Sequence, residues 1–205
     1  MENFTIVMEN NLKNSKEEFK KFLDEVFSIY KGKLKLGEDI RGFKNIYSVD
    51  LDKSPASIRI SYKPSFPSSI KLDTQTHYFS SKIYSKEKVK ENFFDFIDLA
   101  IAMMKSSNNE FIVGSFEIAE TTPKQDVPIQ LLFFKEKEWL PYLKEHLKYS
   151  LKKEFDLEEL KGLTEKNASI FKKYEGFRLI CFYPFLEDKI TKGYTDSNFY
   201  NEVKK

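Results

Sequence analysis

The sequence predicts an α+β fold with a mostly antiparallel sheet of five to seven strands and helices packed mainly on one face. Three observations support this. Two long segments carry apolar residues at helical spacing, several short segments alternate apolar with polar residues, and neighbouring strand segments are joined closely enough to form hairpins. The length of 205 residues fits one domain, 1–205, with a weak two-half organisation, 1–84 and 85–205, as the alternative.

The N-terminal segment predicts a strand followed by a helix. Apolar residues alternate over 4–8, which is the period of a strand. A helix is predicted over 16–31, because Ser15 and Glu18 have the spacing of a capping box and the apolar residues recur on one face. Gly32 stands where a C-terminal cap is expected.

The next segments predict a hairpin, a loop and a third strand. The runs 45–51 and 56–63 alternate in polarity and are joined by a short turn, so they are expected to pair with one face exposed to water. Residues 64–76 contain two prolines and three serines without a stable period, which is typical of a loop. Residues 77–84 alternate again and are expected to form another paired strand.

A second long helix is predicted over 86–105, with Ser85 as its N-terminal cap. Two strands are expected after it, at 111–119 and 129–134. The second of these is apolar on both faces, which is typical of a strand inside a sheet.

The C-terminal third predicts helices and one last strand. A helix is expected over 138–152, and shorter helices are expected after Asp156 and after Thr164, ending at Gly176. The apolar run 177–183 predicts the final strand, and the polar tail that follows has no strong pattern.

The chain has enough apolar side chain to form a substantial core. Hydrophobic residues make up 40% of the sequence, with 20 Phe and 11 Tyr, so a disordered chain is excluded. Six residues on the apolar faces of these elements are predicted to be buried: Phe22, Val26, Phe93, Ile97, Phe133 and Ile180.

Charge and cysteine content favour a cytoplasmic protein. The net charge is only +2, so no overall attraction to nucleic acid or membrane is indicated. Only three of the 34 basic residues are arginine, and the richness in Lys, Phe, Asn, Ile and Tyr indicates a bacterial or phage genome of low GC content. Cys181 is the single cysteine, which excludes internal disulfides, and its apolar surroundings predict a buried thiol. No signal peptide or membrane-spanning run is present.

Motifs for catalysis, cofactors and metals are lacking. The sequence contains no glycine-rich phosphate loop, nucleophile elbow or paired-cysteine site, so no cofactor is expected. An enzyme of unfamiliar type would depend on His77 or on carboxylates near the loop 64–76 as a base, although a histidine at the edge of the core is the plainer interpretation of His77.

A metal site is not expected either. Glu91, Asp95 and Asp98 share one face of the second long helix and have the oxygen ligands that a divalent cation requires. Two lysines lie on the same face, however, so a solvated polar surface accounts for the pattern.

The strongest positive signal is an uneven distribution of charge. Eight basic residues and two acidic ones lie between residues 53 and 90, so this segment has a local charge of +6. Basic residues interleaved with aromatics suit an acidic protein partner, or less favourably single-stranded nucleic acid, while a lysine-covered sheet face is the plainer interpretation. The candidate partner-binding residues are Arg59, Lys63, Phe66, Lys71, Lys82 and Tyr84.

An alternative surface lies on the third helix. Trp139, Tyr142, His146 and Tyr149 are spaced by three, four and three residues, which aligns four ring-bearing side chains on one helix face. These rings either form a platform for a partner or widen the apolar stripe that faces the core.

These observations favour binding over catalysis. We therefore hypothesise a non-catalytic cytoplasmic interaction protein that inhibits or neutralises a macromolecular partner, in the manner of immunity proteins or phage-encoded inhibitors. The alternatives are the enzyme that uses His77 or loop carboxylates and the single-strand nucleic-acid binder on the basic 53–90 face.

Overall fold

The described part of the chain forms an antiparallel sheet with helices. The computed structural model describes residues 3–9, 12–13, 15–43, 46–51, 58–64, 69–80, 82–116, 121–184 and 197–205. Within these residues the strands are β1 Asn3–Glu9, β2 Arg41–Phe43, β3 Ile46–Leu51, β4 Ile58–Lys63, β5 Ser69–Gln75, β6 Ile112–Phe116, β7 Leu131–Lys135, β8 Ile170–Tyr174 and β9 Phe177–Cys181. The helices are α1 Lys16–Ile29, α2 Lys86–Ser106, α3 Trp139–Leu151, α4 Leu157–Asn167 and α5 Asn198–Val203, with a short 3₁₀ helix at Thr76–Phe79.

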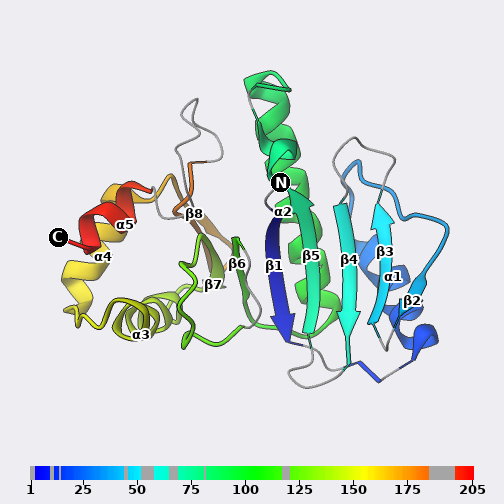
Figure 1. Cartoon of the computed structure of the whole chain (residues 1–205), viewed down its shortest axis with the longest axis horizontal. Coiled ribbons are helices and arrows are strands. Elements are labelled where there is room, and N and C mark those ends of the chain that lie inside the picture. Colours follow the sequence, from blue (N-terminus) through cyan, green and yellow to red (C-terminus); the bar gives the residue numbers. More distant parts are fainter. Residues whose placement is uncertain are drawn as a thin grey trace.

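The nine described strands belong to one sheet in the order β2-β3-β4-β5-β1-β6-β7-β9-β8, with every pair of neighbours antiparallel. The first strand lies in the middle and pairs with β5 on one side and β6 on the other (Figure 1). The α+β class is therefore confirmed, while the expected five to seven strands is an undercount. Strand β7 lies inside the sheet, between β6 and β9, as its apolar sequence predicts.

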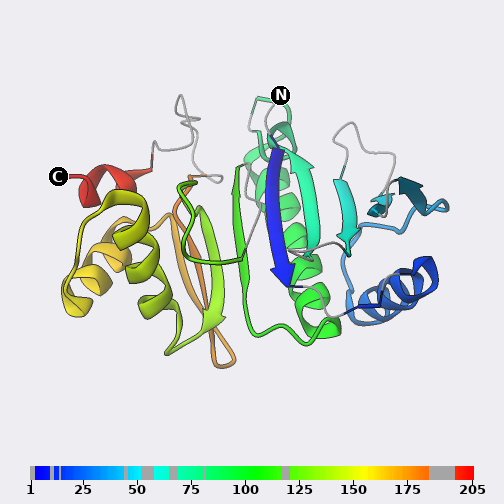
Figure 2. The same ribbon diagram turned by 60° about the horizontal axis from the view of Figure 1, so that its bottom comes forward.

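Helices cover opposite faces of the two halves of the sheet. Ile6 and Met8 of β1 belong to the core under α1 and α2, whereas Val7 between them belongs to the core under α3, α4 and α5. Figure 1 shows α1 and α2 behind strands β1 to β5 and the other helices gathered beside β7; Figure 2 shows the same arrangement from another side. The expectation of helices mainly on one face is wrong, because β6, β7 and β9 bury side chains on both faces and need a second layer.

The two long helices begin as the sequence predicts. Ser15 and Ser85 accept hydrogen bonds from the backbone N–H groups of Glu18 and Lys88. All six predicted core residues are buried. Gly32 is not the C-terminal cap of α1, however, because the helix ends at Tyr30 in an extended conformation.

Two assignments after β4 are wrong. The predicted loop contains strand β5, whose Ile70 and Leu72 face the core while Lys71 and Asp73 face away from it. The predicted strand over 77–84 is a 3₁₀ helix followed by a turn that leads into α2. Strand β2, which the sequence did not indicate, is short, and its three residues are exposed.

The C-terminal assignments also need correction. The helix after Asp156 is α4, but the segment after it forms the hairpin β8–β9 instead of another helix. Gly176 has a φ of 83° and lies in the turn of that hairpin. The same left-handed glycine conformation ends helices and closes hairpins, so the residue type alone does not separate the two. The polar tail contains α5, capped by Ser197.

Candidate protein-binding face

The sheet has a polar face that no helix among the described residues covers. It lies over β2 to β5 on the side opposite α1 and α2, because the alternate residues of these strands belong to the α1–α2 core. We call it the open face. Its side chains are Arg41, Phe43, Ile46, Ser48, Asp50, Arg59, Ser61, Lys63, Ser69, Lys71, Asp73 and Gln75.

Strand register places acidic and basic residues side by side on the open face. Asp50 lies opposite Arg59, and Arg59 lies opposite Asp73, so the three form one cross-strand row. The Arg59 Nε donates to Asp50 Oδ1 at 2.8 Å, and a guanidinium nitrogen of Arg41 lies 3.3 Å from the other Asp50 oxygen. The basic excess of residues 53–90 is therefore partly compensated by Asp50, which precedes this segment in the chain.

Asp73 is the least exposed carboxyl group of this row. Burial raises its pKa above the usual aspartate value, and the hydrogen bond from Thr5 and the nearby Lys71 and Arg59 act in the opposite direction. Thr5 Oγ1 donates to Asp73 Oδ1 at 2.5 Å. The row thus has a carboxylate at its solvent end, Asp50, and a more protected one toward the middle of the sheet.

One corner of the open face is apolar. Phe43 is 71% exposed, the highest value for a large hydrophobic side chain among the described residues, and it lies opposite Ile46, which is 40% exposed. Directly opposed residues of an antiparallel pair share a face, so the two side chains form one patch. Sequence reasoning missed Phe43, because a single aromatic residue in a three-residue strand has no periodicity.

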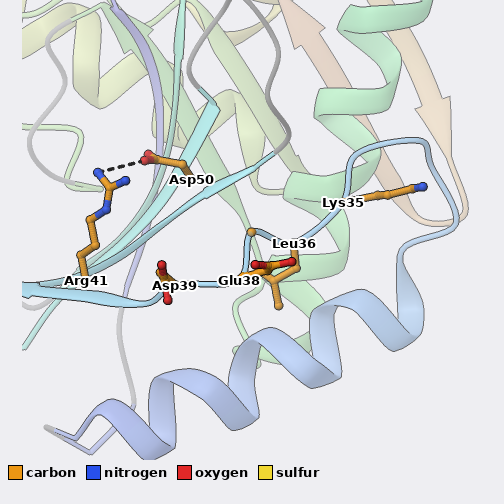
Figure 3. Close-up of a pocket in the computed structure, with 7 residues that line it drawn as sticks. Lys35, Leu36, Glu38, Asp39, Arg41 and Asp50 are labelled. Atoms are coloured by element: carbon orange, nitrogen blue, oxygen red, sulfur yellow. Dashed lines mark ion pairs between the residues drawn. The ribbon is translucent and has the colours of Figure 1, made fainter.

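A pocket opens beside this corner. At one end, Leu36 bridges to Leu51 and the Gly37 N–H donates to the Asp50 carbonyl at 3.1 Å; at the other end, β2 pairs with β3. Between these points, residues 38–40 do not pair with β3. A hollow of about 520 Å³ lies there, lined by Lys35, Leu36, Gly37, Glu38, Asp39, Arg41 and Asp50 (Figure 3). We call it the edge pocket. A side chain at position 37 would contact the Asp50 carbonyl, so the glycine permits this approach.

The structure brings together three of the six residues predicted to bind a partner. Arg59, Lys63 and Lys71 all lie on the open face. Lys82 lies in the turn before α2, and Tyr84 packs partly against the α1–α2 core, so these two are not part of the open face. Phe66 lies outside the described residues.

The alternative surface on α3 is largely inaccessible. Trp139 and His146 are buried, and the ring of Trp139 meets Phe171 edge to face at 5.7 Å. Tyr142 is half-buried and donates to the Thr121 carbonyl at 2.5 Å. Only Tyr149, 37% exposed, is open to a partner, so most of this stripe widens the core.

Two of the three acidic residues that the sequence aligns on one face of α2 have local partners. Asp95 accepts a hydrogen bond from the Tyr30 hydroxyl at 2.6 Å, and Glu91 pairs with Lys33 and Lys88. Asp98 is exposed. Among the described residues, no group of three or more His, Cys, Asp or Glu side chains is arranged to hold a metal ion.

The candidates for nucleophilic or acid–base chemistry lie apart from one another. His77 is in the 3₁₀ helix and half-buried, while Cys181 is fully buried in β9. Burial raises the pKa of the Cys181 thiol to about 12, and its Sγ donates to the Tyr183 carbonyl at 3.3 Å. A second hollow, of about 730 Å³, lies between the end of α2 and the β8–β9 hairpin. His77, His146 and Cys181 are not among the residues that line it.

Comparison with protein families, curated proteins and solved structures found no match to the chain. No helix in the described part of the chain is long and apolar enough to cross a membrane.

Proposed function

We propose that the chain is a non-catalytic interaction protein that inhibits or neutralises a macromolecular partner, with the open face as its docking surface. The observation that carries this proposal is the exposed Phe43–Ile46 patch, set beside charges that strand register holds in place.

The physical chemistry of the patch supports binding. An exposed aromatic next to an exposed aliphatic side chain is unfavourable in water and becomes favourable when a partner covers both. Charged residues border the patch, as polar residues border the apolar part of an interface. Because these residues lie on paired strands, little conformational entropy is lost on docking.

The charges of the open face indicate the class of partner that it suits. Lys63 and Lys71 are half-buried and neither forms an ion pair with a described residue, although Lys71 lies near Asp73, so their ammonium groups can meet a carboxylate of a protein partner. Arg59 is held by Asp50, which reduces the positive potential that a nucleic-acid backbone requires. The geometry therefore favours a protein partner over single-stranded nucleic acid.

Truncation of Phe43 should weaken partner binding. We expect Phe43→Ala to reduce the affinity by about 2 kcal/mol, roughly 30-fold, because an aromatic side chain that a partner covers carries much of the energy of an interface. The partner is first isolated from native lysate with the parent protein as bait, and the affinity of each variant for that purified partner is then measured by calorimetry.

Ile83→Ala is the matched control. Ile83 is also an exposed apolar residue, at 55%, but it lies in the turn before α2 and not on the open face. This variant should bind within twofold of the parent. Equal loss in both variants, or no loss in Phe43→Ala, would show that the open face is not the docking surface.

A further inference from the structure

Strand β2 is one of the two outer strands of the sheet. It stands first in the strand order, and all three of its residues are exposed (Figure 1). Its inner side pairs with β3, and no described strand pairs with its outer side. The outer side of such a strand presents backbone N–H and C=O groups on which another chain can form a further strand.

Strand register shows which backbone groups β2 presents. The Gly37 N–H, on the same side of β3 as β2, donates to the Asp50 carbonyl, so the backbone of Asp50 is directed to that side. Backbone groups alternate in direction along a strand, so Tyr47, three residues earlier, is directed to the other side, toward β4. Gly42 lies opposite Tyr47. The N–H and C=O groups of Gly42 therefore point outward, away from β3.

The two outer strands of the sheet differ in their charge. Strand β8 has two adjacent exposed lysines, Lys172 and Lys173, one on each face, and lysines on an outer strand oppose pairing with another chain. The one charged residue of β2, Arg41, forms an ion pair with Asp50 that holds its guanidinium over β3 (Figure 3). Gly42 has no side chain. The outer side of β2 thus lacks the protection that β8 has.

The apolar patch beside this outer side indicates what can pair with it. A strand added to β2 would place one side chain on the open face next to Phe43 and close to Ile46. Because β2 has only three residues, an added strand can form few backbone hydrogen bonds and needs apolar contact as well. An extended segment with an apolar residue at this position supplies both.

Resting on the proposed function, we propose that an extended segment of the protein partner pairs with β2 and continues the sheet. The pairing is antiparallel, like every pair of neighbouring strands in this sheet, so one residue of the segment exchanges both backbone hydrogen bonds with Gly42. The residue before it lies opposite Phe43 and covers the patch with an apolar side chain.

Two substitutions at Gly42 separate the backbone hydrogen bond from the effect of an added side chain. Proline removes the outward N–H, which a strand at the end of a sheet tolerates, whereas alanine keeps it. Each adds a Cβ atom 3.5 Å from the Tyr47 ring, which is an ordinary contact, and Gly42 is not in the left-handed conformation. Urea unfolding verifies that both variants are folded.

The probe is the blocked tetrapeptide acetyl-Thr-Ile-Thr-Thr-amide, whose Ile would lie opposite Phe43 and whose third residue would lie opposite Gly42. Its control is methylated on the backbone nitrogen of the third residue, which removes the N–H that would donate to the Gly42 carbonyl. Amide shifts of the ¹⁵N-labelled protein are recorded during titration. We expect saturable shifts at Phe43 and Ile46 in the parent and in Gly42→Ala, and about tenfold weaker binding of the methylated peptide or in Gly42→Pro.

Three results would overturn the proposal. The first is equal affinity for the two peptides, and the second is equal affinity of the unmethylated peptide for Gly42→Pro and Gly42→Ala. The third is a dimer of the parent in sedimentation equilibrium that Gly42→Pro abolishes, because a second copy of the chain would then pair with β2.

The isolated partner separates this proposal from the proposed function. It should bind Gly42→Ala within twofold of the parent and Gly42→Pro about tenfold more weakly. If Phe43→Ala weakens the partner and Gly42→Pro does not, the open face is the docking surface but the partner does not continue the sheet. If neither variant weakens the partner, the proposed function fails as well.

Discussion

Acidification from pH 6.5 to pH 4 should lower the free energy of unfolding by about 3 kcal/mol through His146 alone. This side chain is fully buried between α3 and the segment 121–126. Burial lowers its pKa to about 4, and the hydrogen bond to Pro123 and the nearby Asp126 only partly oppose that effect. The imidazole of His146 is therefore neutral in the folded protein above about pH 4.

The direction of the pH effect follows from the two states. In the unfolded chain the His146 side chain becomes protonated near pH 6.5, whereas in the folded protein it becomes protonated only near pH 4. Between these pH values, protonation of His146 therefore favours the unfolded state. The stability that the protein gains from keeping His146 neutral is present above pH 6.5 and is lost as the pH falls from 6.5 to 4. Asp73 has the opposite effect on stability. Burial raises its pKa, so the folded state favours the protonated carboxyl group, and protonation of Asp73 at low pH stabilises the fold.

The tautomer of His146 can be assigned from its partner. A proline carbonyl only accepts hydrogen bonds, so the Nδ1 atom, 3.1 Å from it, carries the proton. The Nε2 atom then has a free lone pair and is buried without a hydrogen-bond partner among the described residues. Protonation of Nε2 would place a positive charge in apolar surroundings, which disfavour it.

The measurement compares the parent with His146→Gln, which keeps a donor for the Pro123 carbonyl and does not titrate. Urea unfolding is followed at pH 7, 5.5 and 4 at constant ionic strength. The loss of stability between pH 7 and pH 4 should be about 3 kcal/mol smaller in the variant. The same pH dependence in both proteins would show that His146 does not titrate between its usual pKa and pH 4 in the folded state.

The features predicted correctly are those that depend on nearby residues. Ser15 and Ser85 cap their helices because a serine side chain reaches the N–H group three residues on, whatever the rest of the chain does. Strand β5 was missed because its apolar side is short and two prolines lie in the segment before it. It is a strand because β1 and β4 pair with its two edges, and such pairing is not visible in a local pattern.

The candidate site shows the same division. Arg59 and Lys63 alternate with apolar residues of β4, so their common face was predictable. The ion pair of Arg59 with Asp50 was not predictable, because Asp50 lies nine residues earlier and meets Arg59 only through strand register. Lys82 and Tyr84 were assigned to the same surface because the sequence made their segment a strand, and the turn before α2 places them elsewhere.

The second large effect is expected at Gly32, where alanine should destabilise the protein by about 3 kcal/mol. An added Cβ would overlap Asp95 Oδ1 and the Tyr30 hydroxyl. These two groups tie the end of α1 to α2: the Tyr30 hydroxyl donates to Asp95 at 2.6 Å and accepts from the Leu34 N–H at 3.0 Å. Gly32 is thus required for space and not, as the sequence suggests, for a helix cap.

Gly162→Ala should have the opposite sign. Gly162 lies inside α4, is exposed, and has no atom within 4 Å of an added Cβ, so alanine should stabilise the helix by about 0.5–1 kcal/mol. Urea unfolding of both variants at pH 7 measures the difference. Because the two substitutions are chemically identical, a similar effect in both would mean that Asp95 and Tyr30 do not pack against Gly32, whereas a loss confined to Gly32→Ala places the junction of α1 and α2 at this contact.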